Sequence, residues 1–255
     1  MMWLNKIAVS LGLVGAMAAL CIADRAEAQT PPPGNPVVVE LFTSQGCSSC
    51  PPADALLGEL ARLPNVVALA FHVDYWDSIG WRDRYEIPTA AARQVRYVDA
   101  LSLSSAFTPQ IVIDGRASYV GSDRRRILAA LAQQRQEQVP VVVEVSPSEL
   151  TISLPERAGQ SGYDVNLAAY LPEATTAIGR GENSGRTLAE FNIVREFRRA
   201  ATWDGKPKVL RLPLASFPAD ATRVAVLLQK SNQGSIVGSA VATLRSAPAL
   251  VTQRK

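Results

Sequence analysis

The feature that most constrains this chain is the segment ELFTSQGCSSCPPAD at residues 40–54, where two residues separate a pair of cysteines. The apolar, β-branched run PVVVELF at 36–42 precedes the pair and is typical of a strand buried on both faces. After the pair, apolar side chains recur at helical spacing, at Ala53, Leu56, Leu57, Leu60 and Ala61. The sequence therefore predicts that Cys47 and Cys50 lie on a strand-to-helix turn.

The position of the cysteines before a helix favours thiol chemistry. A helix N-terminus stabilises a nearby thiolate through its free N–H groups and its dipole. Cys47 lies farther from the helix along the chain and is the expected nucleophile, and Cys50 is the expected resolving partner. A purely structural disulfide is disfavoured, because a bridge across two residues closes too short a loop to constrain the unfolded chain strongly.

The N-terminus predicts export. Lys6 precedes an apolar stretch at 7–23, and small residues around Glu27 offer a cleavage site after Ala28. This pattern is typical of a secretory signal peptide spanning 1–28, with a membrane anchor as the alternative. We therefore expect an exported protein, periplasmic or secreted, whose mature chain retains Cys47 and Cys50 but not Cys21.

The mature chain shows no sign of a membrane or nucleic-acid function. No further apolar run is long enough to span a bilayer. The net charge of +3 is too small to predict a nucleic-acid partner. Residues 29–36, rich in proline, predict an extended spacer.

A strand and helix order follows from the first half of the mature chain. The patterns predict a buried strand at 66–74 and a helix at 89–99. They also predict a hairpin, with a short strand at 110–113, a turn at 114–115 and a returning strand at 116–120. A helix capped by Ser122 follows the hairpin. Together with the first strand and helix, they define a predicted domain at 37–138.

The pattern of apolar and polar residues changes from Pro140 onward. Short alternating runs separated by Pro, Gly, Asn and Asp predict a small antiparallel β-sandwich-like domain at 139–247, followed by a tail at 248–255. The loop-like segment 180–199 carries five arginines, which could bind anions or form a solvated face. The expected fold class is thus α/β, with a β-rich accessory domain.

The CxxC motif between the first strand and helix, with Thr108-Pro109 ahead of the hairpin, resembles a thioredoxin-fold domain. The segments FTSQGCSSCPPAD, FHVDYWDSIGW, FTPQIVIDG and RGENSGRTLAEFNIVREF are similar to those of the secreted DUF1223 family, a family of unknown function. The resemblance runs nearly end to end. It implies a thioredoxin-like fold and an exported location, but no settled activity.

The thioredoxin resemblance implies further site residues. It places a cis Pro109 beside the disulfide and makes the backbone of Thr108 a substrate-binding edge; an ordinary trans proline is the alternative. Thioredoxins also hold a buried carboxylate on the first strand, and Glu40 could serve as a proton relay for Cys50. The alternative for Glu40 is a strand end turned to solvent.

The most direct functional hypothesis is an exported thiol–disulfide oxidoreductase without a cofactor, acting on a protein or small-molecule thiol or disulfide with an unknown redox partner. Gly46 and Ser48-Ser49 depart from the usual thioredoxin motif, so the direction of exchange stays open. One alternative is a Cu(I)- or Zn-binding protein using Cys47, Cys50 and His72, although a lone histidine in an apolar strand is usually a core residue. Another is a non-catalytic interaction module.

Overall fold

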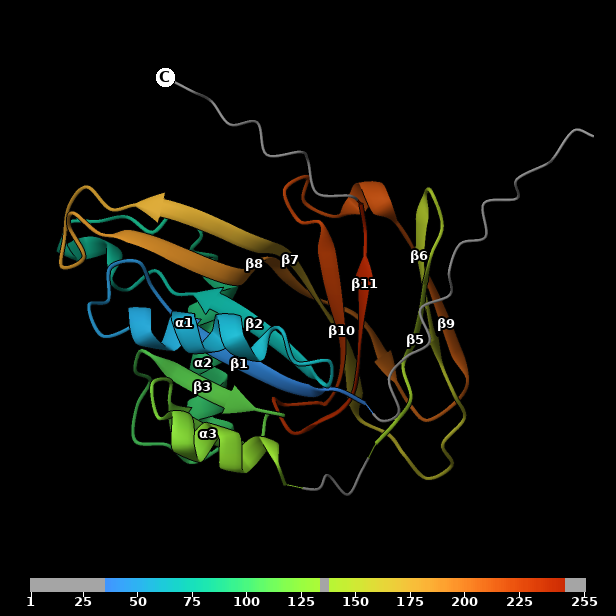
Figure 1. Ribbon diagram of the computed structural model, residues 1–255. Helices are drawn as coiled ribbons and strands as arrows, with labels where there is room; N and C mark the ends of the chain where they lie inside the picture. The colour runs from blue at the N-terminus through green and yellow to red at the C-terminus, as the bar shows by residue number, and fades with distance from the viewer. Residues whose placement is uncertain (1–34, 134–137, 246–255) are drawn as a thin grey trace, which may run out of the picture.

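The computed structural model describes residues 35–133 and 138–245 as a mixed α/β structure with few helices (Figure 1). An eight-stranded, mostly antiparallel sheet has the strand order β11-β10-β7-β8-β2-β1-β3-β4, and a second sheet has the order β5-β6-β9. The predicted signal peptide at 1–28, most of the spacer at 29–36 and the tail at 248–255 lie outside the described residues. Within the described part, no helix has the length and apolar character needed to cross a membrane.

The first half of the chain confirms each of the elements predicted there. They are β1 (Val37–Thr43), α1 (Pro51–Leu60), β2 (Val66–His72), α2 (Pro88–Ala100), β3 (Gln110–Ile113), β4 (Ala117–Val120) and α3 (Arg124–Leu131). A short 3-10 helix that was not predicted, η1 (Asp77–Ile79), lies between β2 and α2. One detail was wrong: the carboxylate of Asp123, and not Ser122, caps α3 by accepting a hydrogen bond from the backbone N–H of Arg126.

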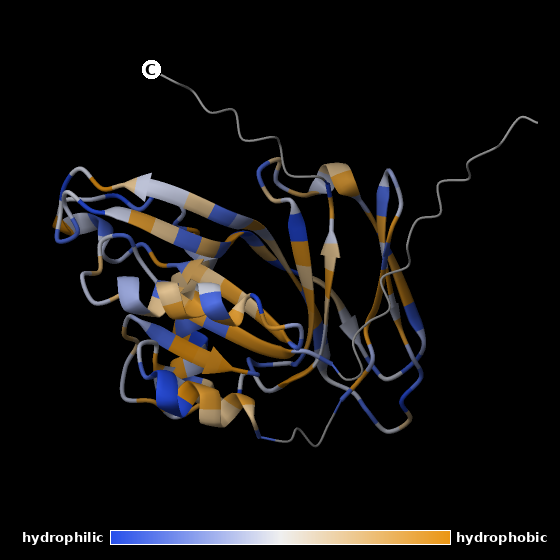
Figure 2. Cartoon of the chain, viewed as in Figure 1, coloured by the Kyte–Doolittle hydropathy of each residue, from blue (hydrophilic) through white to orange (hydrophobic). Residues whose placement is uncertain are grey.

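Strand β1 is central because every one of its residues is buried. It pairs in parallel with β2 and antiparallel with β3. Its side chains alternate between two cores, so that Val39 and Leu41 contact the core shared with α1 and α3, whereas Val38 and Phe42 contact the core shared with α2. The two faces of the sheet are therefore covered by different helices, and Figure 2 shows apolar residues concentrated in these central strands.

The second half supplies β5 (Val142–Val145), β6 (Glu149–Leu154), β7 (Tyr163–Ala177), β8 (Thr187–Trp203), β9 (Lys208–Pro213), the 3-10 helix η2 (Leu214–Ser216), β10 (Arg223–Lys230) and β11 (Ile236–Thr243). Strand β8 joins β2 in parallel where Ile193 pairs with Ala70. The strands of the second half thus continue the sheet of the first. The β5-β6-β9 sheet packs against this extension through a shared apolar core. Whether 37–138 and 139–247 are two domains stays a prediction.

The β7–β8 hairpin is the element that the sequence described least well. Its strands have 15 and 17 residues, and only 178–186 form the connecting loop, so the prediction of a loop over 180–199 was wrong. Leu188 and Glu190 are buried in β8, whereas Thr187 and Ala189 are exposed. Because Glu190 is charged but buried, the sequence of this segment does not show the alternation of apolar and polar residues that would predict a strand. In Figure 1 the hairpin extends past the sheet beside α1.

Candidate functional site

The cysteine pair lies where β1 meets α1, as predicted. Cys47 and Cys50 form a disulfide, and Cys50 is the N-cap residue of α1. The Cys50 carbonyl accepts backbone hydrogen bonds from Ala53 at 2.8 Å and Asp54 at 3.1 Å, which begin the helix. The side chain of Cys47 lies 3.4 Å from the Ser49 hydroxyl. Both cysteines are 0% exposed, so the disulfide is closed to solvent in this conformation.

The second predicted feature lies against the same turn. The bond between Thr108 and Pro109 is cis, as the resemblance implied. A Cβ atom added to Gly121 would lie 2.9 Å from side-chain atoms of both Pro109 and Ala53, so this proline is close to the first turn of α1. Trp76 connects the two loops, because its indole N–H donates to the Thr108 hydroxyl at 2.8 Å and its Cβ would lie 3.0 Å from a Cβ on Gly46.

The β7–β8 loop, residues 178–186, holds the cysteine turn from the other side. The side-chain amide of Asn183 donates to the backbone carbonyls of Gln45 and Cys47, both at 2.9 Å. The Ser48 N–H donates to the Glu182 carboxylate at 3.2 Å. The second half of the chain therefore fixes the backbone conformation of the CxxC turn.

Four buried ionisable residues lie beneath the turn: Asp54, His72, Asp83 and Glu190. His72 Nδ1 lies 2.7 Å from an oxygen of Asp83 and 3.9 Å from an oxygen of Glu190. The Thr43 hydroxyl donates to Asp54 at 2.8 Å. The four residues come from α1, β2, the segment after η1, and β8, so the cluster exists only in the folded chain.

Gln45 connects this cluster to the cysteines two residues later. Its backbone N–H donates to Asp83 at 2.8 Å, and its side-chain amide donates to Glu190 at 2.9 and 3.0 Å. The side-chain oxygen of Gln45 accepts a hydrogen bond from the indole N–H of Trp81 at 2.9 Å. With the Asn183 contact to its carbonyl, every polar group of Gln45 is bound.

Burial alters the proton affinities of the cluster. Desolvation raises the pKa of Asp54 from 3.8 to about 7, although the charge of His72 and the Thr43 hydrogen bond oppose it. Desolvation likewise raises the pKa of Glu190. For His72, desolvation works to lower the pKa, but the charge and hydrogen bond of Asp83 outweigh it and raise the pKa. The cluster can thus hold a proton near neutral pH close to the CxxC turn.

Glu40 does not lie with the cysteines. Its carboxylate is buried and binds Arg93 through Nε at 2.6 Å and Nη2 at 3.0 Å, and it also accepts from the Tyr97 hydroxyl. Glu40 shares the α2-side face of β1 with Val38 and Phe42, because side chains alternate along a strand. The structure therefore brings Glu40 neither to solvent nor to Cys50.

The structure places His72 in a hydrogen bond with Asp83, on the side of β2 opposite Phe71 and Val73 as the strand period predicted. Among residues 35–133 and 138–245, no group of three or more His, Cys, Asp and Glu side chains has a geometry suited to a metal ion. The metal alternative with Cys47 and Cys50 stays a prediction.

The family described as "Protein of unknown function (DUF1223)" matches residues 38–229. The chain belongs to this family. A crystal structure of a protein from Agrobacterium tumefaciens is similar at 32% identity and a TM-score of 0.72, covering 83% of this chain and 96% of that one. HBP35 of Porphyromonas gingivalis is similar in fold alone, at 13% identity and a TM-score of 0.56, over 87% of this chain and 79% of that one. No curated protein matches the sequence.

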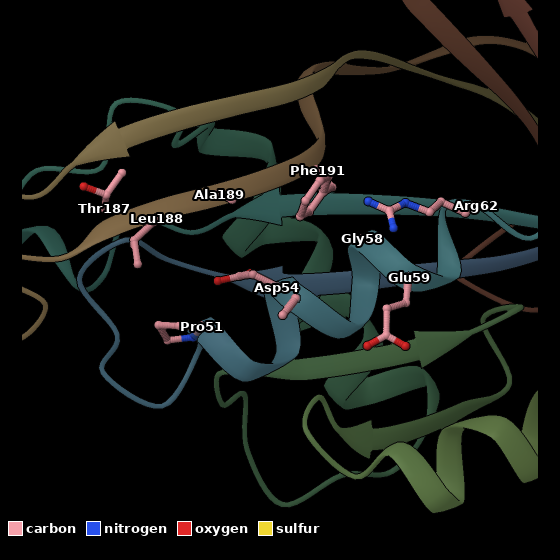
Figure 3. A pocket seen from close by; sticks show the side chains of 10 residues that line it. Pro51, Asp54, Gly58, Glu59, Arg62, Thr187, Leu188, Ala189 and Phe191 are labelled. Carbon is pink, nitrogen blue, oxygen red and sulfur yellow. The ribbon is translucent and has the colours of Figure 1, made fainter.

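An open groove begins beside the cysteine turn of this DUF1223 chain. It has a volume of about 380 Å³ and runs between α1 and β8, as Figure 3 shows. Its lining comes from Pro51, Asp54, Ala55, Gly58, Glu59, Arg62, Thr187, Leu188, Ala189 and Phe191. Asp54 therefore borders both the buried cluster and a surface that solvent reaches.

Sequence reasoning missed Asp54, Asp83, Glu190 and Asn183 as parts of this DUF1223 site. Asp54 gave one usable signal: it is an acidic residue one turn after Cys50, next to apolar positions that face the core. For the other three no local signal exists, because the contacts that bring them into the site join residues between 11 and 145 positions apart in sequence.

Proposed function

We propose that this chain is an exported thiol–disulfide oxidoreductase in which Cys47 and Cys50 are the reacting pair. The observation that carries the proposal is the position of their disulfide at the N-terminus of α1, close to the cis Pro109 and above a buried acid cluster. A helix N-terminus favours a thiolate at this position. The N-terminal sequence pattern supports an oxidising compartment, in which such a pair would be used.

The arrangement of residues 37–131 supports a thioredoxin-like architecture for the first half. The strands follow the order β2-β1-β3-β4, with β1 and β2 parallel and β3 and β4 antiparallel. Helices α1 and α3 pack on one face and α2 on the other. The β-rich second half would then be an accessory part that supplies the β7–β8 loop.

The reaction can be written for the oxidised chain and a substrate dithiol. A substrate thiolate attacks Cys47 Sγ, the Cys47–Cys50 bond breaks, and Cys50 leaves as a thiolate that takes a proton. The second substrate thiolate then attacks the substrate sulfur of the mixed disulfide and releases the thiolate of Cys47. The substrate loses two electrons, which reduce the disulfide. The reverse sequence reduces a substrate disulfide.

Asp54 is the best candidate for the group that exchanges a proton with Cys50. It lies one helical turn after Cys50, and burial raises its pKa to about 7, close to the pH at which a thiolate must be made or protonated. This role replaces the one expected of Glu40, whose carboxylate is held by Arg93.

Thiol trapping tests the function. The protein should isolate with a Cys47–Cys50 disulfide, and its reduced form should expose one fast-reacting thiol by mass spectrometry after brief alkylation. Cys47→Ser should abolish that reactivity, Cys50→Ser should trap mixed disulfides, and the control Ser48→Ala should behave as wild type. Two equally inert thiols in the reduced wild type would refute the assignment of Cys47 as nucleophile.

A metal titration distinguishes the alternatives. Reduced protein is titrated with Cu(I) and with Zn(II), and His72→Ala is the matched variant. Tight stoichiometric binding that His72→Ala weakens strongly would favour the metal-binding alternative over redox exchange. Absence of both thiol exchange and metal binding would favour the non-catalytic interaction module.

A further inference from the structure

A second cleft lies on the side of the large sheet that faces α2, away from the cysteine turn. It has a volume of about 450 Å³. Five elements line it: α2, β7, β8, β10 and the turn between β10 and β11. The lining residues are Thr89, Ala92, Arg93, Arg96, Asp164, Asn166, Phe197, Arg198, Arg199, Gln229, Asn232 and Gln233.

The charge of this cleft is unbalanced. Four arginines line it against the single carboxylate of Asp164. Three of these arginines have carboxylate partners. Glu40 binds Arg93, Glu196 lies 3.2 Å from Arg198, and Asp164 lies 3.4 Å from Arg199. Arg96 has no carboxylate partner within the described residues; its Nε donates to the neutral side-chain oxygen of Gln233 at 3.2 Å. Excess positive charge therefore centres on Arg96.

The environment of Arg96 supports this interpretation. Arg96 remains exposed to solvent over much of its side chain, but partial burial, and then the charge of the neighbouring Arg93, lower its pKa. A lowered arginine pKa means that its positive charge is less stable here than in water. A bound anion would remove that penalty by supplying the missing counter-charge.

Gln233 provides the second, independent observation. It is only 7% exposed and lies on the β10–β11 turn with a left-handed backbone, φ 62°. Its oxygen accepts from Arg96, but its Nε2 finds no hydrogen-bond acceptor in the part of the chain that the structure describes. A buried donor without an acceptor is costly, so an oxygen atom from a ligand would satisfy it.

We propose that this cleft binds a small anion whose charge is carried by carboxylate or phosphate oxygens. Arg96 supplies the main charge, Arg199 adds to it, and the side-chain amide of Gln233 donates a hydrogen bond. Arginine fits this ligand class because its planar guanidinium pairs with two oxygens at once. The site is separate from Cys47 and Cys50, and the proposal does not depend on their redox function.

Isothermal titration calorimetry of the full mature chain at low ionic strength tests the proposal, with citrate and inorganic phosphate as separate probes. At least one probe should bind with one-to-one stoichiometry, and the probe that binds identifies carboxylate or phosphate as the preferred group. Arg96→Gln should weaken binding at least tenfold, as expected for a lost charged hydrogen bond. Gln233→Leu, of similar size, should also weaken it.

Arg125→Gln is the matched control, because Arg125 is an exposed arginine on α3, which packs on the other face of the sheet. It should leave binding unchanged, and circular dichroism should show that all three variants are folded. Failure of both probes to bind at millimolar concentration would overturn the proposal. Equal affinity in Arg96→Gln and wild type would also overturn it.

Discussion

Replacement of Asn183 by alanine should speed reduction of the Cys47–Cys50 disulfide. Both cysteines are 0% exposed, so a reductant must wait for the turn to open. The side-chain amide of Asn183 holds the turn closed by donating to the carbonyls of Gln45 and Cys47 at 2.9 Å each. Removal of that amide should therefore increase the fraction of molecules in which the disulfide is accessible.

The size of the effect follows from the two lost hydrogen bonds. Each contributes about 0.5–1.5 kcal/mol net, so together they favour the closed turn by about 1–3 kcal/mol. Each 1.4 kcal/mol is a factor of ten in an equilibrium, which converts to roughly a 5- to 150-fold increase in the open fraction. When opening and closing are fast compared with attack, the reduction rate rises by the same factor.

The assay is pseudo-first-order reduction by dithiothreitol, quenched with an alkylating agent and read by mass spectrometry. Ser184→Ala is the control, because the Ser184 hydroxyl donates to the Gly179 carbonyl within the same loop and does not touch the cysteine turn. Asn183→Asp is a second test. It keeps an oxygen for Arg186, which binds Asn183 Oδ1 at 3.0 Å, but removes both donors. A wild-type or slower rate in both Asn183 variants, with the fold intact, would refute the reasoning.

Two substitutions test the buried charges. Burial raises the pKa of Asp54 from 3.8 to about 7, so between these values the folded state binds more protons than the unfolded chain and stability falls as pH rises. In Asp54→Asn the side chain can still accept the hydrogen bond from Thr43. The free energy of unfolding of this variant, measured in urea, should match that of wild type near pH 4 and exceed it at pH 8 by up to about 4 kcal/mol. A variant less stable than wild type at pH 8 would contradict the raised pKa. Glu40→Gln leaves Arg93 buried without its carboxylate and should cost about 3–5 kcal/mol, whereas Glu86→Gln, in a pair with the exposed Arg82, should change little. A Glu40→Gln variant as stable as wild type would show that the pair contributes nothing.

The elements around the cysteines could be predicted because their signals are local. The β-branched run of β1 and the helical spacing after Pro51 each lie within a few residues. The Asp114-Gly115 turn was predicted from two residues, and both adopt the positive φ angles, 47° and 63°, that such a hairpin needs. The same locality explains the position of the cysteine pair at the start of α1.

The environment of the cysteines could not be predicted, because it depends on pairings across the whole chain. Glu190 reaches Gln45 only because β8 joins β2 in parallel, a pairing that one contact between Ala70 and Ile193 defines. The thioredoxin resemblance predicts Glu40 near Cys50, but successive side chains of a strand point to opposite faces of the sheet. Leu41, the next residue, faces α1, and Glu40 faces α2.

Gln45 shows why the second half of the chain belongs to the site. Its backbone N–H is bound by Asp83 of the first half, but its carbonyl and side-chain amide are bound by Asn183 and Glu190 of the second half. Without the β7–β8 hairpin, Gln45 would lose these partners two residues before Cys47, and the disulfide would lose its closed turn. Because both cysteines are buried, we expect the stability of the hairpin to limit how fast a reductant reaches the disulfide. In the proposed oxidoreductase, the β7–β8 hairpin would thus control how readily a substrate thiol reaches Cys47.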